Sequence, residues 1–154
     1  MQESKVTVQR ETVNQCVRDI CPLLEKHWEE VALYRDRIDL DPDFTRYRML
    51  EDAGGLVILT ARMGGKLIGY SVFVVSDHMH YQSCKVASND VLFVSFEYRH
   101  TTTTGLRLIR ESEKTLKSLG VNRVLWHIKP KNDWSLILRH RGYDQEEIIM
   151  GKLL

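Results

Sequence analysis

Residues 90–109, DVLFVSFEYRHTTTTGLRLI, decide the fold because an apolar strand is followed here by an amphipathic helix. The strand ends in the apolar run 91–94, and the helix begins near Leu106 and runs to Leu119. A helix start of this kind leaves unpaired backbone N–H groups at the positive end of the helix dipole. The loop between them, with four consecutive threonines, is therefore interpreted either as a phosphate site or as a solvent-facing turn with threonine caps.

The rest of the chain is organised around this stretch as alternating helices and strands. Gly64-Gly65 joins two apolar runs and predicts a tight hairpin, whereas Pro22 is expected to kink or split the helix that contains it. In chain order we expect a strand at 5–9, a helix from the N-cap Thr12 to about Val31, a second helix from 41–43 to Ala53, strands at 56–63, 66–75 and 85–94, the helix at 106–119, a strand at 123–128, a short helix at 133–141 and a final strand at 146–154.

This order of elements predicts the fold class. An antiparallel meander followed by a strand–helix–strand crossover is typical of one mixed sheet covered by helices. We therefore expect an α/β protein of the α+β type, with a single, mostly antiparallel sheet and flanking helices in one domain that spans residues 1–154.

Composition excludes several classes of function. The 154 residues are 43% apolar and 28% charged, which is typical of an ordinary globular protein and not of a disordered chain. A net charge of +1 disfavours a dedicated nucleic-acid binder, and no apolar run is long enough to span a membrane. Cys16, Cys21 and Cys84 lack metal-ligand spacing, so we expect no metal, reduced thiols and a cytoplasmic location.

The opening stretch resembles the central motif of the GCN5-related N-acetyltransferase (GNAT) superfamily, and in particular its small phage- and prophage-encoded members. That motif consists of a strand, a Pro-Glu-Tyr-Arg-like turn, a loop of the form Gln/Arg-x-x-Gly-x-Gly/Ala and a helix. Residues 96–99, Phe-Glu-Tyr-Arg, stand at the turn, and Arg141-Gly142-Tyr143 is similar to a Leu-Gly-Phe near the end of the family's chains. The resemblance implies the GNAT fold over nearly the whole chain and transfer of an acetyl group from acetyl-CoA to a primary amine, directly within a ternary complex.

The resemblance also implies where acetyl-CoA would bind. Its pantetheine arm would lie along Phe93 and Val94, and Asn132 would lie near the coenzyme, unless that residue is simply an N-cap. Either Arg99 or His100 takes the Gln/Arg position of the loop, and the sequence does not choose between the two registers. Threonine in place of glycine is costly if the loop requires positive φ. The pyrophosphate would lie on Arg99, His100, Thr101, Thr102, Thr103, Thr104 and Gly105.

Two further residues are candidates for catalysis. Asp90 stands where many members carry a glutamate that accepts the amine's proton, often through a water, although it could instead cap an irregular strand start. The tyrosine that commonly reprotonates the thiolate is replaced by Leu138, which we expect in the core. Water or His127 could supply that proton, and His127 could equally be structural.

The acceptor and the partners are less determined. The superfamily acetylates small molecules and proteins, so a small-molecule or protein amine is expected, and a homodimer is compatible with related proteins. Trp28, Tyr34, Phe44 and Tyr47 come from the first two helices, which wall off the acceptor in this family, although aromatic residues at helical spacing are more often core than ligand contacts. The alternative function is that of a degenerate member that binds CoA or protein partners without catalysis, and the threonine-rich loop and the missing tyrosine keep it open.

Overall fold

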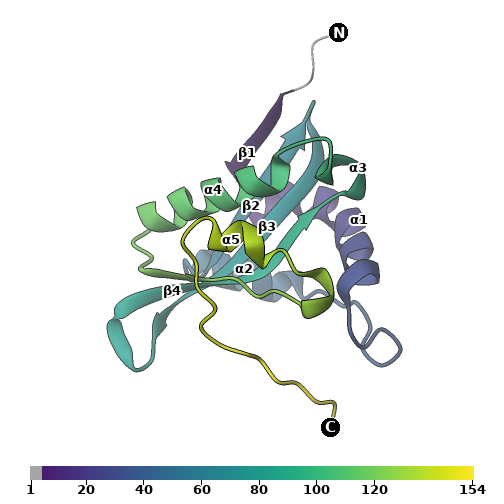
Figure 1. The fold of residues 1–154 in the computed structure, drawn as a ribbon. Helices are drawn as coiled ribbons and strands as arrows, with labels where there is room; N and C mark the ends of the chain where they lie inside the picture. The colour runs from purple at the N-terminus through teal and green to yellow at the C-terminus, as the bar shows by residue number, and fades with distance from the viewer. Residues whose placement is uncertain (1–4) are drawn as a thin grey trace.

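A five-stranded sheet forms the centre of the computed structural model, which describes residues 5–154 (Figure 1). The strands lie in the order β1-β2-β3-β4-β5, and every neighbouring pair is antiparallel except β4 and β5, which are parallel. The expected mixed, mostly antiparallel sheet is thereby confirmed. The elements are β1 (Val6–Arg10), α1 (Val13–Val31), α2 (Phe44–Asp52), β2 (Leu56–Met63), β3 (Lys66–His78), β4 (Tyr81–Val94), α3 (Phe96–Arg99), α4 (Thr104–Ser118), β5 (Arg123–Leu125), the 3₁₀ turn η1 (Pro130–Asn132) and α5 (Ser135–Arg139).

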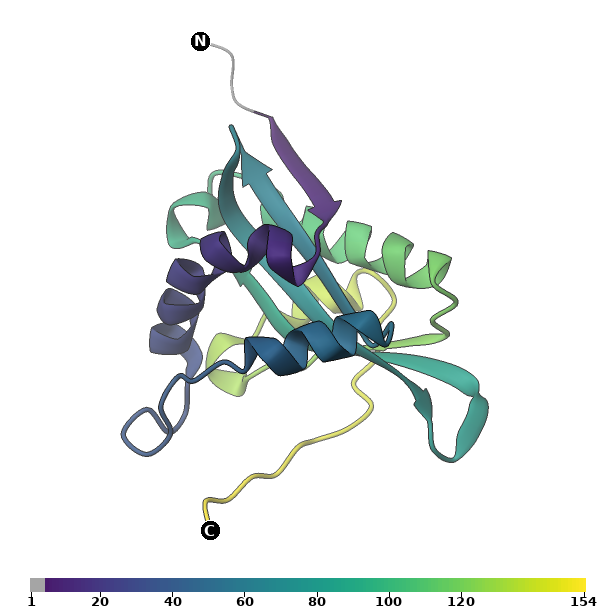
Figure 2. The same cartoon turned by 180° about the vertical axis from the view of Figure 1, so that it is seen from behind.

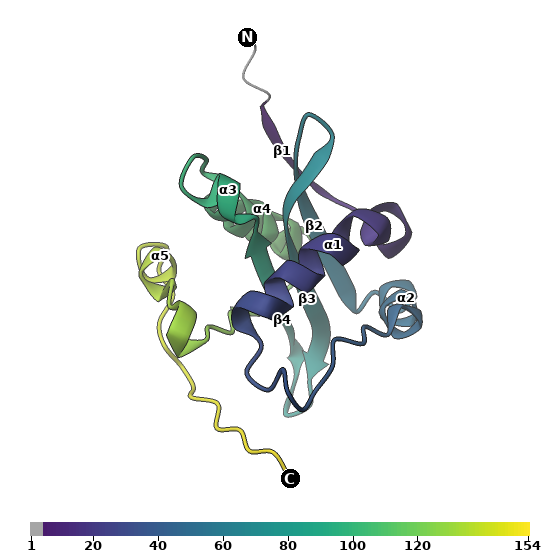
Figure 3. The same ribbon diagram turned by 90° about the vertical axis from the view of Figure 1, so that its right-hand side faces the viewer.

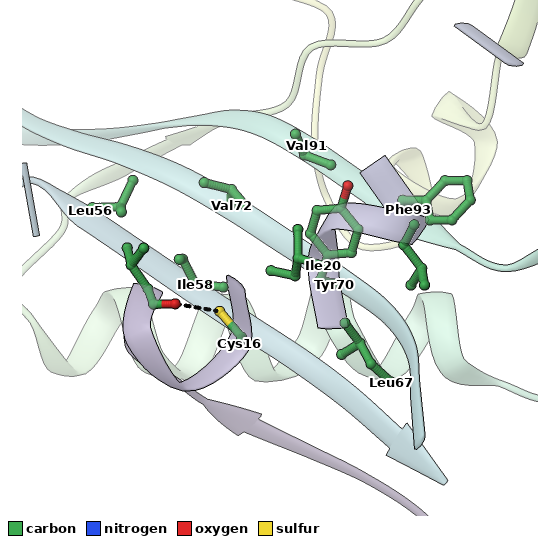
Figure 4. Packing of buried hydrophobic residues seen from close by; sticks show 11 residues of the cluster. Cys16, Ile20, Leu56, Ile58, Leu67, Tyr70, Val72, Val91 and Phe93 are labelled. Carbon is green, nitrogen blue, oxygen red and sulfur yellow. Dashed lines mark hydrogen bonds between the residues drawn. The ribbon is translucent and has the colours of Figure 1, made fainter. Parts of the chain in front are cut away.

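Helices cover both faces of this sheet. Figure 1 shows α4 in front of the strands, and Figure 2 shows α1 and α2 in front of the opposite face. Because successive side chains of a strand point to opposite faces, β2 sends Leu56 and Ile58 under α1 and α2, and Val57 and Leu59 under α4. The cluster beneath α1 and α2 is drawn in Figure 4. Two apolar layers, one on each side of the sheet, therefore hold the molecule together.

The first helices differ in detail from the expectation. Thr12 is the N-cap of α1, as predicted, but Pro22 does not split the helix, which continues to Val31. The apolar residues on either side of Pro22 pack on the sheet, and this packing compensates for the one backbone hydrogen bond that proline removes. The second helix begins at Phe44, because Asp43 is its N-cap and accepts from the Arg46 N–H at 2.9 Å.

The strands also differ at their ends. The polar stretch between the third and fourth strands does not break the sheet, because β3 and β4 continue as a paired ribbon to His78 and Tyr81. The strand expected at 123–128 ends at Leu125. The helix expected from Leu106 begins at Thr104.

The expected final strand is wrong. Residues 144–154, here called the C-terminal tail, form no helix and pair with no strand. Figures 1 and 3 show this tail leaving the body of the molecule. A strand needs a neighbouring edge as well as a suitable sequence, and the tail's path leads it away from the sheet.

None of the helices in residues 5–154 is both long enough and apolar enough to cross a membrane.

The last turns of α1 bring a histidine onto the sheet beside the predicted pantetheine path. The ring centroids of His27 and Phe93 lie 5.2 Å apart. Burial lowers the pKa of His27 to about 4, and the nearby cations Lys129 and Arg99 lower it further, whereas Glu30 opposes them. This imidazole is therefore uncharged at neutral pH.

We predict that His27 makes the fold sensitive to mild acid. The unfolded chain binds a proton at this imidazole near pH 6.5 and the folded chain only near pH 4, so stability is lost as the pH falls between these values. The loss by pH 4 should reach roughly 3 kcal/mol relative to pH 7, as measured by urea unfolding at a series of pH values. In His27→Phe this part of the pH dependence should disappear, whereas the exposed control His80→Gln should keep it. The same pH profile in His27→Phe and the wild type would contradict the assignment.

Candidate functional site

A β-bulge in β4 is the starting point of the site. Phe73 of β3 pairs with Asn89 and Val72 pairs with Val91, so Asp90 is an extra residue without a partner on β3. The buried side-chain amide of Asn89 holds the bulge, because its Nδ2 donates to the carbonyls of Val72 (3.2 Å) and Val91 (2.8 Å). The carboxylate of Asp90 is thereby turned outward to an exposed position. Asn89 is a residue that the sequence analysis missed.

Beyond the bulge, β4 and β5 separate. They pair only from Val86 to Ser88 on β4, and the chain after Leu125 no longer follows β4 as a strand. We call the place where the end of β4 and residues 126–129 no longer pair the fork. Within residues 5–154 no strand pairs with the last part of β4 on this side.

The backbone of Val94 faces the fork. The next residue, Ser95, donates its N–H to Ile68 on the β3 side at 2.8 Å. Because successive residues of a strand direct their backbone groups to opposite sides, Val94 directs its N–H and C=O into the fork. An extended chain of amides could therefore pair with β4 at this point, as an added strand does.

A glycine on β3 allows this geometry. A Cβ at Gly69 would lie 2.8 Å from the carbonyl oxygen of Phe93, which is closer than real Cβ atoms approach. Only glycine therefore lets β3 lie this close to the end of β4 and fixes the path of Phe93 and Val94.

The guanidinium of Arg99 lies at the fork, next to the last residue of β4. Its Nε donates to the Val94 carbonyl at 2.6 Å, and its Nη2 pairs with Glu30 of α1 at 2.6 Å. The same group lies over the ring of Phe93, 5.2 Å from its centroid. Arg99 thus ties α1 to β4, and an extended ligand must share or displace its contact with Val94.

The threonine-rich loop requires no positive φ. His100 has φ −103° and Thr103 has φ −91°, and among the described residues the five with positive φ are all glycines outside this loop. Residues 96–99 form the short helix α3, so the chain passes from one helical turn to the next. The cost expected for threonine in place of glycine therefore does not arise.

The threonine hydroxyls build the loop. Thr101 Oγ1 donates to the carbonyl of Glu97 at 2.9 Å, and Thr102 Oγ1 donates to that of Tyr98 at 2.7 Å. Thr102 Oγ1 also accepts from the N–H of Thr104, whose side chain is fully buried. These three side chains are structural, and the fourth, Thr103, makes no capping bond.

Backbone N–H groups remain free at the start of α4. Those of Thr103, Gly105 and Leu106 have no acceptor within residues 5–154. A Cβ at Gly105 would contact only Val94, at 3.9 Å, so packing does not require glycine there. The free N–H groups and this open position lie beside the fork and fit a phosphate that approaches the backbone closely.

Asp90 lies next to an aromatic pocket on the α1–α2 side. The hydroxyl of Tyr47 donates to Asp90 Oδ2 at 3.4 Å, and burial together with the Asp90 charge raises the pKa of Tyr47 to about 12. The hydroxyl of Tyr70 is buried without a partner in the described part of the chain, and burial raises its pKa as well. Figure 4 shows Tyr70 between Val72 and Phe93. An apolar cavity of about 30 Å³ lies here, lined in part by Phe44, Tyr47 and Tyr70.

The remaining predicted residues lie on the other side of the fork. His127 is exposed in the segment after β5. Asn132 ends η1 instead of starting α5, and it lines a polar groove of about 440 Å³ together with Glu30, Asp36 and Lys129. Leu138 is buried, as expected. In residues 5–154 no group of three or more potential ligands could hold a metal ion.

Sequence comparisons find no match, whereas structure comparisons find chains of the same fold. No protein-family model matches the sequence, and no curated protein matches it either. Among solved structures, the chain is similar to an aminoglycoside acetyltransferase from an uncultured soil metagenomic sample, in complex with sisomicin. The identity is 15% and the TM-score is 0.74, and the match covers 97% of this chain and 96% of that one.

Two other neighbours have the same architecture. Glucosamine-6-phosphate N-acetyltransferase from Arabidopsis thaliana is 13% identical with a TM-score of 0.73, over 97% of this chain and 98% of that one. The aminoglycoside N-acetyltransferase AAC(6')-Iy, solved in complex with CoA, is 15% identical with a TM-score of 0.73, over 99% of this chain and 97% of that one. The chain therefore has the acyl-CoA N-acyltransferase fold of the GNAT acetyltransferases.

Proposed function

We propose that the protein is an N-acetyltransferase that uses acetyl-CoA and a small-molecule amine. The observation that carries the proposal is the edge of β4 at Val94, which within residues 5–154 has no strand partner on this side, shares its carbonyl only with Arg99, and lies beside the unpaired N–H groups of Thr103, Gly105 and Leu106. An extended pantetheine arm followed by a pyrophosphate would satisfy both features at once. The neighbour that was solved with CoA supports this proposal through its fold. The likeness to phage-encoded members and a cytoplasmic location stay predictions.

The chemistry requires a proton acceptor near the amine. In the proposed mechanism the amine nitrogen attacks the thioester carbon, the new N–C bond forms, and the C–S bond breaks. Asp90 is the exposed carboxylate at the bulge, and it accepts, through a water, the proton that the amine must lose. The thiolate takes its proton from water, because Leu138 is buried and cannot donate one. His127 is an alternative donor, although no contact of its side chain supports that role.

The surroundings of Asp90 and the structural neighbours favour a small-molecule amine. Phe44 and Tyr47 line the apolar cavity next to Asp90, and in the proposal they contact the acceptor. Of the three neighbours described above, two are aminoglycoside acetyltransferases and one is a glucosamine-6-phosphate N-acetyltransferase, which supports a small-molecule acceptor.

Asp90→Asn tests the proposed base. We expect kcat to fall by about 10²- to 10³-fold in an assay of CoA release with acetyl-CoA and a panel of amines, because the amide cannot accept the proton. CoA affinity, measured by calorimetry, should remain unchanged. The control Asp77→Asn removes an exposed carboxylate near the far end of β3 and should leave turnover unaffected.

The same assay separates the proposal from its alternative. Full activity of Asp90→Asn would exclude Asp90 as the base. Binding of CoA without turnover of any amine by the wild type would instead favour a degenerate, CoA-binding module.

Gly105→Val should weaken CoA binding. Its branched side chain would stand where the pyrophosphate must approach the backbone, so CoA affinity should fall at least tenfold. Gly105→Ala should keep CoA affinity, since the motif that this loop resembles accepts alanine here, and should be about 0.5 kcal/mol more stable to urea, because alanine fits the helical backbone and has free space. Gly151→Val, at a glycine with open space around it, is the matched control and should leave CoA affinity unchanged. Unaltered CoA affinity in Gly105→Val would place the pyrophosphate elsewhere.

A further inference from the structure

The polar groove at the end of α1 has no ligand in the mechanism proposed above. Its volume of about 440 Å³ is that of a small-molecule site, and Figures 1 and 3 show the end of α1 beside the turn that leads into α5. Glu30 lines one wall, and its partner Arg99 binds the Val94 carbonyl at the fork. Lys129 lines the opposite wall and ends the segment 126–129 on the other side of the fork. The groove therefore opens beside the fork.

The carboxylates of the groove are both paired with arginines. Glu30 pairs with Arg99 at 2.6 Å, and Asp36 lies 3.8 Å from the guanidinium of Arg37. Within residues 5–154 neither arginine belongs to the lining of the groove. The negative charges in the groove are thus compensated from outside it.

The cations of the groove have no such compensation. The Nζ of Lys129 donates to the Val31 carbonyl at 2.7 Å, and Nη1 of Arg35 donates to the Glu29 carbonyl at 2.7 Å. These two charged groups are therefore held in place by the last turn of α1. The third cation, Lys131, is exposed. No carboxylate in the described part of the chain forms an ion pair with any of the three.

The buried imidazole of His27 senses this excess of positive charge. Burial is the main reason for its lowered pKa, and the charge of Lys129 comes next. Lys129 lowers the pKa by more than Glu30 raises it, and Arg99 lowers it further. The end of α1 is thus a place where an anion is stabilised and a further cation is repelled.

We propose that the groove binds an anionic group, a carboxylate or a phosphate, carried by the amine that is acetylated. Lys129 and Lys131 would donate to the anion from one wall, and Arg35 from the other. Because the groove opens beside the fork, one small molecule can place its anion in the groove and its amine at the fork. The inference rests on the proposed acetyltransferase function and narrows its substrate class to amines that also carry an acidic group.

Two matched pairs of amines test this preference in the assay of CoA release. 4-Aminobutyrate and butylamine differ by a carboxylate, and phosphoethanolamine and ethanolamine differ by a phosphate. We expect kcat/KM to be about tenfold higher for the anionic member of at least one pair, and the pair that shows the larger ratio identifies the acidic group. Equal kcat/KM within both pairs would overturn the proposal.

A charge reversal at Lys131 assigns the preference to the groove. Lys131→Glu should reduce the ratio of kcat/KM values about tenfold, because a repulsion replaces an attraction. The control Lys117→Glu makes the same change at the exposed end of α4 and should keep the wild-type ratio. An unchanged ratio in Lys131→Glu would overturn the proposal. A raised KM for acetyl-CoA with an unchanged ratio would do so too, since it would place a phosphate of the coenzyme in the groove.

A binding measurement distinguishes failure of this inference from failure of the proposed function. In a titration of the ¹⁵N-labelled wild type, 4-aminobutyrate or phosphoethanolamine should shift the amide resonances of Lys131 and Asn132, whereas butylamine and ethanolamine should not. Such shifts without turnover of any amine would count against acetyl transfer and still support the anion site. Absence of anion-dependent shifts in the groove would overturn the anion site whatever the activity.

Discussion

The buried amide of Asn89 is the contact on which the site depends. Its Nδ2 donates to the carbonyls of Val72 on β3 and Val91 on β4, beside the inserted residue Asp90, and each hydrogen bond contributes about 1 kcal/mol. Without the bulge, every residue from Val91 onward would face the opposite side of the sheet. Val94 would then direct its backbone groups toward β3 and not into the fork. The bulge thus fixes both the outward position of Asp90 and the free edge beside it.

The loop after β4 shows how side chains can replace glycine. Thr101 and Thr102 donate their hydroxyls to carbonyls four residues earlier, and Thr104 fills a buried position beneath the loop. The loop is thereby held in ordinary φ values while the N–H groups of Thr103, Gly105 and Leu106 stay free. Threonine in this loop is therefore compatible with phosphate binding, and the departure from the glycine-rich pattern is not by itself a sign of lost function.

The sequence was sufficient for most of the fold. Apolar periodicity and the Gly64-Gly65 turn predicted the meander, and the order of strand and helix predicted the parallel pair β4–β5. The final strand was wrong because a sequence with high β-propensity says nothing about whether an edge lies within reach. Because the tail has no neighbouring strand within residues 5–154, its isoleucines Ile148 and Ile149 stay exposed to solvent.

The site could be predicted only in part. Residues 99–105 and Asp90 were predicted through the resemblance and stay predictions, whereas Asn89 was missed because a buried asparagine in a strand has no sequence signature. His27 could have been found, since it follows Leu24 by three residues and Ile20 by seven on the buried face of α1. Arg99 was expected on the phosphate loop, but its side chain contacts Val94 and Glu30 in the fork, a contact between distant segments that spacing cannot reveal.

The central claim is that coenzyme A lies along the end of β4 with its pyrophosphate on the start of α4. A titration of the ¹⁵N-labelled full chain with coenzyme A, followed by amide resonances, tests it most directly. The account predicts saturable shifts at Val94, Thr103, Gly105 and Leu106, with little change in α2. Absence of shifts at millimolar coenzyme A, or shifts confined to other elements, would contradict it.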